Sequence, residues 1–259
     1  MNELVSVITP TYNSEAFISK SIDSVLNQSY SNLELLIIDD ASSDNTRVIL
    51  EQFRKKDPRI NVILLEKNSG SGIARNKGIE MAKGRYLAFL DSDDIWHKDK
   101  LKDQISFMMT HGHSFTYTKY AYINEPGLVI KEYNSAPNRC NYFRLLLQNC
   151  IGCSTVIIDA EKLGKEYMPE LRNRQDWALW LNYIRKSGKA YGLKNSYTFY
   201  RMKQGSISSN KMKLFKFHWL IYNEIEKYNI IISSLLFTLN ILIISYYSIV
   251  NKVLIKVRS

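Results

Sequence analysis

Short apolar runs alternate with helical segments over the first third of the chain. The runs at residues 4–9, 33–38, 61–65 and 86–90 are apolar on both faces, which is typical of strands covered by helices on both sides, and Pro10 is expected to end the first. Between them, residues 14–28, 44–56 and 72–82 carry apolar side chains at helical spacing. The alternation predicts an α/β fold with a mostly parallel, mixed sheet and helices on both faces.

The pattern is less regular after Lys98. Helices are predicted at 98–111, 142–149 and 176–186, and strands at 115–123, 129–133, 154–158 and 197–200. The 259 residues contain no internal repeat and no linker-like segment. The simplest organisation is one compact domain over residues 1–209, followed by a C-terminal helical tail over residues 210–259.

The amino-acid composition indicates a folded protein without a disulfide framework. A chain that is 45% hydrophobic and 23% charged has the balance of a folded protein, and three cysteines cannot form a disulfide framework, so a reducing, cytosolic compartment is expected. The net charge is +10, and residues 200–259 hold nine Lys/Arg against two Asp/Glu. Such a basic segment favours phosphates of a nucleic acid or of a membrane surface, or is simply a solubilising face.

Residues 230–250 favour the membrane among these partners. These 21 residues carry no charge, although serine, threonine and asparagine interrupt them, and Tyr246, Lys252 and Arg258 lie at or beyond their end. Tyrosine and lysine at a helix end suit a headgroup layer. The alternative is a helix that is buried in the core or pairs subunits. Spanning and interfacial arrangements both remain open.

Unusual residues follow three of the predicted strands. The first is followed by Pro10-Thr11-Tyr12-Asn13, the second by Asp39-Asp40, and the fourth by Asp91-Ser92-Asp93-Asp94. Ligands bind at the carboxyl ends of strands in open α/β sheets. The sequence has neither a GxGxxG motif after the first strand nor a GxxxxGK[ST] loop, which argues against dinucleotide-dependent enzymes and P-loop NTPases.

Asp91, Asp93 and Asp94 place three carboxylates within four residues at the end of a buried strand. Such groups repel one another and lose solvation, which a bound Mg²⁺ or Mn²⁺ would relieve. The alternative is a solvated acidic turn that caps the next helix. A second acidic pair, Asp39-Asp40, at a neighbouring strand end favours the cation site.

The motifs VSVITPTYN, LLIIDDASSDNT and NSGSGIARNKGIEMAKGRYLAFLDSDDIW follow one another over residues 4–104, and GCSTVIID, RQDWALWL and YRMKQGSIS continue to about residue 209. This series resembles the family-2 glycosyltransferases of the bacterial surface-polysaccharide type, which have the GT-A nucleotide-diphospho-sugar transferase fold. The resemblance implies inverting transfer of a sugar from a nucleotide-sugar donor, with UDP the expected nucleotide.

The resemblance also implies a donor site. Thr9, Pro10, Thr11, Tyr12 and Asn13 would hold the nucleoside together with Asp39 and Asp40, with Asp39 facing the base. Arg75 would help to hold the donor, and Asp91-Ser92-Asp93 matches the DxD element. Asp91, toward the ribose, and Asp93 would bind Mn²⁺ or Mg²⁺ at the donor diphosphate. A divalent cation there offsets the charge of the leaving group.

Inversion by single displacement requires a carboxylate that accepts the proton of the acceptor hydroxyl. Asp176 matches the catalytic Asp of the family, although this chain has Gln175-Asp176 where Glu-Asp is common. The alternative role for Asp176 is helix capping. Arg201, in a segment with Gln204 and Ser206 after the last strand, is predicted to close over the donor diphosphate, or else to be a surface arginine.

We therefore expect a metal-dependent glycosyltransferase, peripheral or anchored at the cytoplasmic face of the cell membrane, that acts on a glycan or lipid-linked acceptor. The apolar tail would then contact the membrane, and a nucleic acid is not an expected partner. Two other hypotheses remain: a nucleotidyltransferase with a similar sheet, and a catalytically silent glycan-binding or scaffold protein of the same fold.

Overall fold

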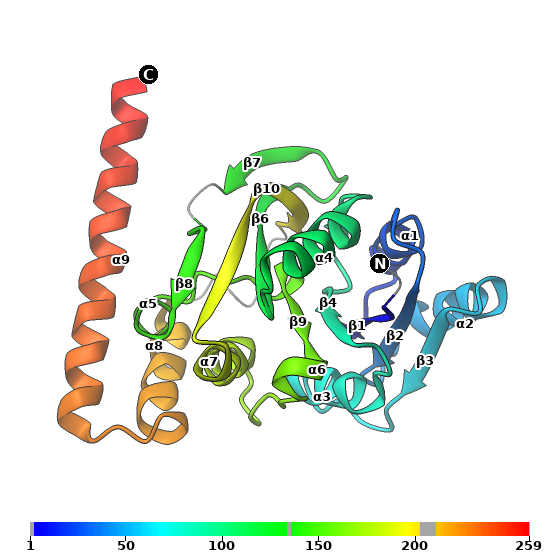
Figure 1. Cartoon of the computed structure of the whole chain (residues 1–259), viewed down its shortest axis with the longest axis horizontal. Helices are drawn as coiled ribbons and strands as arrows, with labels where there is room; N and C mark the ends of the chain where they lie inside the picture. Colours follow the sequence, from blue (N-terminus) through cyan, green and yellow to red (C-terminus); the bar gives the residue numbers. More distant parts are fainter. Residues whose placement is uncertain (1–2, 134–135, 203–210, 259) are drawn as a thin grey trace.

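The computed structural model describes residues 3–133, 136–202 and 211–258. Its framework is one ten-stranded sheet in the order β3-β2-β1-β4-β9-β6-β10-β5, with β7 paired to β6 and β8 to β10. Helices cover both faces, and the long helix α9 stands beside the domain (Figure 1). The predicted α/β architecture with a C-terminal helical tail is confirmed.

The N-terminal half of the sheet is parallel. β1 (Val5–Thr11) lies between β2 (Leu33–Asp39) and β4 (Tyr86–Phe89), and β3 (Ile60–Leu64) pairs with β2. Alternate side chains of these strands enter two separate cores, one on each face, which is why the strands are continuously apolar. The helices between the strands are α1 (Ile18–Leu26), α2 (Thr46–Lys56) and α3 (Ser71–Met81).

β1 continues through Pro10, where the sequence predicted that it would end. Proline lacks the N–H that a central strand normally donates. The pairing of β1 with β4 stops at Ile8 and Phe89, so beyond that point β1 pairs only with β2. The backbone N–H and C=O groups of the even-numbered residues of β1 point toward β4, as the hydrogen bond from the Leu90 N–H to the Ile8 carbonyl demonstrates. Pro10 therefore faces a side on which no strand partner remains.

Gly78 allows α3 to lie close against the sheet. A Cβ atom at this position would stand 2.5 Å from Cγ2 of Ile8 and 2.8 Å from Cδ1 of Ile38. Only glycine fits such an approach without displacing those side chains. The contact fixes the helix that carries Arg75 over β1 and β2.

The second half of the sheet is mainly antiparallel. β9 pairs antiparallel with β4 and β6, and β10 pairs parallel with β6 but antiparallel with β5 and β8. β10 is much longer than predicted, because the polar Lys194 and Asn195 at a register shift interrupt its apolar pattern. The elements are β5 (Ile95–Trp96), α4 (Lys100–His111), β6 (Phe115–Ile123), β7 (Val129–Tyr133), β8 (Arg139–Asn141), α5 (Tyr142–Leu147), the 3₁₀ turn η1 (Cys153–Thr155), β9 (Ile157–Asp159), α6 (Ala160–Leu163), α7 (Gln175–Ser187) and β10 (Lys189–Arg201).

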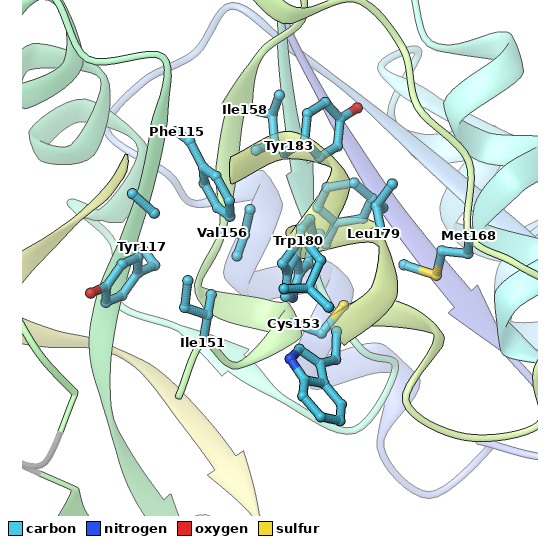
Figure 2. Packing of buried hydrophobic residues seen from close by; sticks show 14 of the residues in the cluster. Phe115, Tyr117, Ile151, Cys153, Val156, Ile158, Met168, Leu179, Trp180 and Tyr183 are labelled. Carbon is cyan, nitrogen blue, oxygen red and sulfur yellow. The ribbon is translucent and has the colours of Figure 1, made fainter. Parts of the chain in front are cut away.

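Helix α7 joins the two halves through its tryptophans. The Trp180 ring packs against Phe89 of β4 at 5.3 Å and against Phe115 of β6 at 5.8 Å between centroids. Figure 2 shows Trp180 at the centre of this buried cluster, with Cys153 beside it. Trp177 is also fully buried and donates its indole N–H to the Leu145 carbonyl over 2.8 Å. Both tryptophans are therefore core residues.

The C-terminal elements begin as part of the domain. They are α8 (Lys211–Leu220), the π-helical turn η3 (Ile221–Ile225) and α9 (Ile230–Arg258). Ile221 and Tyr222 belong to the main core, and the Tyr222 hydroxyl donates to the Leu146 carbonyl over 3.0 Å. The division at residue 209 remains a prediction.

Helix α9 buries polar side chains against the domain and exposes apolar side chains, the reverse of the usual arrangement. Ser233 and Asn240 are buried on the face toward the domain, whereas Ile231, Leu235 and Leu242 are exposed on the opposite face. None of the helices in the described part of the chain combines the length and the hydropathy that a membrane crossing requires.

Candidate active site

The carboxyl ends of β1, β2 and β4 meet at one edge of the sheet. Thr11 stands opposite Asp39 in the parallel register, and the segment after β4 begins beside β1, where Leu90 donates to the Ile8 carbonyl over 3.0 Å. Tyr12 lies just beyond β1 and is half exposed. The three segments predicted from the sequence therefore leave adjacent strands.

The Asp39 carboxylate is fully buried at this edge. Its Oδ2 atom accepts hydrogen bonds from Nε of Arg47 (2.7 Å) and from the Ser42 N–H (3.1 Å). Its Oδ1 atom has no partner among the described residues, and neither have the buried hydroxyls of Thr9 and Thr11. Leaving a buried polar atom unpaired costs about 1–3 kcal/mol. These three oxygen atoms are therefore available to a ligand with hydrogen-bond donors.

Asp40 and Asn13 hold the surrounding loops. Both carboxylate oxygens of Asp40 are used, since they accept the N–H groups of Ser69 and Gly70 at 2.7 Å each, just before α3. Asn13 has a left-handed backbone with φ 46°, and its side-chain oxygen accepts the Ser43 N–H at 2.8 Å. These contacts order the loops after β1 and β2 around Asp39.

Asp94 is the structural member of the acidic segment. It is buried and accepts hydrogen bonds from the Ser154 hydroxyl (2.6 Å) and the Arg201 N–H (3.1 Å). Burial, together with the charges of Asp93 and Asp91, raises the pKa of Asp94 well above its usual range. Asp91 and Asp93 are partly exposed, so they are the carboxylates within reach of a ligand.

Ser92 connects the acidic segment to α1. Its hydroxyl lies 2.8 Å from the Ser14 hydroxyl, and its carbonyl accepts the Ser21 hydroxyl at 2.8 Å. The same Ser21 hydroxyl also reaches the Asp94 carbonyl at 2.6 Å. Helix α1 thereby fixes the loop that presents Asp91 and Asp93.

Three charged residues from distant parts of the chain come together beside this loop. Arg75 of α3 donates from Nη2 to Oδ1 of Asp91 over 2.5 Å. Burial opposes the charge of Arg75, yet the carboxylates of Asp91 and Asp176 raise its pKa above the usual value. Burial raises the pKa of Asp176, against the opposing effects of Arg75 and Arg174. A partly buried carboxylate with a raised pKa is suited to accept a proton.

Gln175 positions Asp176 at the start of α7. Its side-chain amide donates to the Ser71 hydroxyl over 2.8 Å, which ties the first turn of α7 to the first turn of α3. A Cβ atom at Gly72 would stand 3.1 Å from Cγ of Gln175. The residue that departs from the common Glu-Asp pair is thus a structural link between Asp176 and the helix that carries Arg75.

The structure corrects the predicted setting of Arg201. This residue ends β10 and is buried, whereas the sequence placed it in a segment after the last strand. Its guanidinium donates to the backbone carbonyls of Asp93 (2.8 Å), Asn124 (3.0 Å) and Glu125, and stacks on Phe17. It therefore supports the acidic loop, and its contact with a donor diphosphate remains a prediction. Gln204 and Ser206 lie outside the described residues.

The acidic loop fits a divalent cation that is shared with a ligand. No group of three or more His, Cys, Asp or Glu side chains in the described ranges could hold a metal ion alone. Mg²⁺ and Mn²⁺, however, often use one or two carboxylates together with substrate phosphates. Asp91, with one oxygen engaged by Arg75, and Asp93 match that kind of site.

Comparison with known proteins identifies the family. The model of Glycosyl transferase family 2 matches residues 6–159, and the chain belongs to this family. TuaG of Bacillus subtilis, a glycosyltransferase assigned to teichuronic acid biosynthesis, is 47% identical over 224 residues, 86% of this chain and 89% of that protein. The Escherichia coli protein WfgD, named UDP-Glc:alpha-D-GlcNAc-diphosphoundecaprenol beta-1,3-glucosyltransferase, is 43% identical over 223 residues, 85% of this chain and 86% of that protein.

Solved structures confirm the GT-A fold. Staphylococcus aureus TarS 1-349 in complex with UDP-GlcNAc has a TM-score of 0.69 at 25% identity, and the match covers 85% of this chain and 66% of that one, just under two thirds. The mannosyltransferase PcManGT from Pyrobaculum calidifontis in complex with GDP-Man and Mn²⁺ has a TM-score of 0.67 at 14% identity, over 86% of this chain and 64% of that one, and supports the fold alone. The protein is a glycosyltransferase, as predicted, rather than a nucleotidyltransferase or a silent scaffold.

Three residues at the site were missed by the sequence analysis. Arg47 neutralises Asp39, the Ser154 hydroxyl bridges Asp94 and the Asp91 N–H (3.1 Å), and Arg174 precedes Asp176. Arg47 lies in the first turn of α2, the helix that follows the acidic pair, and this position could have suggested it. Ser154 depends on long-range contacts that no local pattern reveals.

Proposed function

We propose that the enzyme transfers a sugar from a UDP-sugar to a hydroxyl of a lipid-linked or glycan acceptor, with inversion, in the synthesis of a surface polysaccharide. The observation that carries this proposal is the convergence of Asp91, Arg75 and Asp176 at the edge where Asp39 holds an unpaired oxygen. The region around Asp39 can thus bind a nucleotide, while Asp176 accepts a proton.

The donor would bind along the carboxyl ends of β1, β2 and β4. Asp39, Thr9 and Thr11 offer hydrogen-bonding oxygens to the nucleoside, and Pro10, Tyr12, Asn13 and Asp40 shape the pocket around them. Asp93 and Asp91 would hold Mn²⁺ or Mg²⁺ against the diphosphate, and this cation would offset the charge of the leaving group. The names of WfgD and of the TarS complex support UDP as the nucleotide.

Asp176 would act as the general base. It takes the proton from the acceptor hydroxyl while that oxygen bonds to the anomeric carbon and the bond from that carbon to the diphosphate oxygen breaks. Burial raises the pKa of this carboxylate, which brings it closer to the proton affinity that an effective base requires. The charge of Arg75 favours the ionised form and opposes this effect of burial.

The acceptor and the tail form the second part of the proposal. The undecaprenol-linked acceptor in the name of WfgD supports a lipid-linked acceptor here. The exposed Ile231, Leu235 and Leu242 on α9 support a peripheral membrane contact by residues 210–259, beside a catalytic domain over residues 1–209, at the cytoplasmic face.

The test combines ligand binding with product analysis. UDP, GDP, dTDP and CMP are each added to the full chain with and without Mn²⁺, and a cation-dependent rise in melting temperature with one nucleotide is expected. With the matching nucleotide sugar, NMR of the product is expected to report an inverted anomeric centre, and Asp93→Ala is expected to abolish transfer. A retained configuration, or transfer by the variant at the parent rate, would contradict the proposal.

A further inference from the structure

Arg174 has an unusual conformation and setting. It precedes α7 with φ 64° and ψ 13°, a left-handed backbone that L residues other than glycine and asparagine rarely adopt. Its Nε atom is buried and has no hydrogen-bond partner among the described residues. Burial lowers the pKa of Arg174, and Asp176 offsets this effect only in part. The strained backbone and the unpaired Nε of Arg174, at the start of the helix that carries Asp176, make this residue a candidate ligand contact.

Asp176 lies within the electrostatic reach of two arginines that differ in their partners. Arg75 is bonded to Asp91 and so belongs to the donor side of the site. Arg174 interacts with Asp176 and with His218 of α8, on the side of the C-terminal helices. The acceptor hydroxyl must approach Asp176, so Arg174 lies where an anionic group of the acceptor would arrive.

His218 supplies a second unsatisfied atom on that side. The side chain is 4% exposed, and its Nδ1 lies 3.0 Å from Oδ1 of Asn240 on α9, whose amide donates to the Leu147 carbonyl. The orientation of Asn240 makes Nδ1 the donor, which leaves Nε2 with a lone pair and no partner among the described residues. Burial and the charge of Arg174 lower the pKa of His218 to about 4. An anion bound here would favour the imidazolium, whose Nε2–H would then donate to it.

Helix α9 leads from this point to an apolar surface. Asn240 faces His218, and Leu235 and Leu242 are exposed on the opposite face of the same helix. If a lipid diphosphate bound with its diphosphate beside Arg174, its lipid chain would be long enough to reach the apolar face of α9. Resting on the function proposed above, we propose that Arg174 and His218 bind the diphosphate of a lipid diphosphate acceptor, and so place its sugar hydroxyl at Asp176.

The test uses a lipid diphosphate without a sugar, so that it does not depend on the identity of the acceptor sugar. Farnesyl diphosphate is titrated into the full chain with UDP and Mn²⁺ at saturation, and binding is measured from the shift in melting temperature. Arg174→Asn removes the guanidinium and suits the left-handed backbone. We expect this variant to weaken binding about tenfold or more, Arg174→Lys to weaken it less, and the exposed control Arg172→Asn to match the parent.

A second lipid tests whether the protein recognises the diphosphate or the lipid chain. Farnesol, which lacks the diphosphate, is expected to bind much more weakly than farnesyl diphosphate. Equal binding of the two lipids, no binding of farnesyl diphosphate to the parent protein, or equal binding of farnesyl diphosphate by the parent and Arg174→Asn would overturn the inference. Failure of the proposed function is read separately, because it would remove the Mn²⁺-dependent shift with UDP in every variant.

Discussion

The two halves of the sheet contribute to the active site in different ways. In the N-terminal half, the proposed site residues Thr11, Asp39 and Asp91 lie at or just after the ends of three adjacent parallel strands. Near neighbours such as Ser42 and Arg47 hold the loop around Asp39. In the C-terminal half, Asp176 lies in the first turn of α7, and Arg201 ends β10. The backbone N–H of Arg201 donates to Asp94, which lies 107 residues away in the sequence. The proposed donor site is therefore built into the local architecture of the parallel strands, whereas the place of the proposed base, Asp176, depends on long-range packing.

The largest effect is expected at Asp176. Asp176→Asn removes the proposed proton acceptor but keeps the shape of the side chain, so turnover should fall by about 10²–10⁴. The affinity for UDP with Mn²⁺ should stay at the parent value, because the donor half is untouched. The exposed Asp23→Asn serves as the control. Initial rates and a UDP titration check both statements, and a rate near that of the parent would remove Asp176 from the mechanism.

The next effect tests the packing that joins the halves. Trp180→Ala leaves a cavity between Phe89 of β4 and Phe115 of β6 and should reduce the free energy of unfolding by about 3–5 kcal/mol. The half-buried Trp219→Ala on α8 should cost less. Denaturant unfolding measures both, and equal losses would mean that Trp180 does not link the halves.

Lys100 tests the packing beneath the acidic loop. Its Nζ is fully buried, has no hydrogen-bond partner among the described residues, and lies 4.0 Å from the centroid of the Trp96 ring. Burial lowers its pKa well below the usual value, so the unfolded chain binds a proton that the folded chain releases. Stability is therefore lost as the pH falls below the unfolded pKa of about 10.4.

Lys100→Met should raise the free energy of unfolding at pH 7 by about 1–3 kcal/mol. It should also flatten the rise in stability that the parent shows between neutral and alkaline pH. The exposed Lys102→Met should change neither property. Unfolding curves at several pH values make the comparison, and a destabilised Lys100→Met would show that the amine has a partner.

The smallest effect is expected at Arg47, in the N-terminal half of the sheet. Arg47→Met removes the cation bonded to the buried Asp39 and should weaken UDP binding by about tenfold without changing the turnover of saturated enzyme. Arg54→Met is the control, because Arg54 is exposed on the same helix and is paired with Glu51 rather than with Asp39. Titration of the donor distinguishes them, and a loss of turnover at saturation would contradict the separation of the two halves.

The same difference explains what the sequence could predict. The four parallel strands, with Asp39 and Asp91 at or after their ends, follow from local patterns, because continuous apolar runs mark buried strands and polar residues mark their ends. Arg75, by contrast, was predicted only through the resemblance to the family. The length of β10 and the buried place of Arg201 could not be predicted, because a bulge with polar residues breaks the pattern and the partners lie far away in the chain. Pro10 was misjudged because only the staggered end of β4 makes proline acceptable there.

In the proposed site, the acidic loop binds the donor independently of Asp176. Calorimetric titration of UDP with Mn²⁺ into Asp93→Ala and Asp176→Asn tests it most directly. We expect Asp93→Ala to lose about tenfold or more in affinity, and Asp176→Asn to bind like the parent. Parent-like binding by Asp93→Ala, or loss of binding in Asp176→Asn, would show that donor binding and the base are not separate in this way.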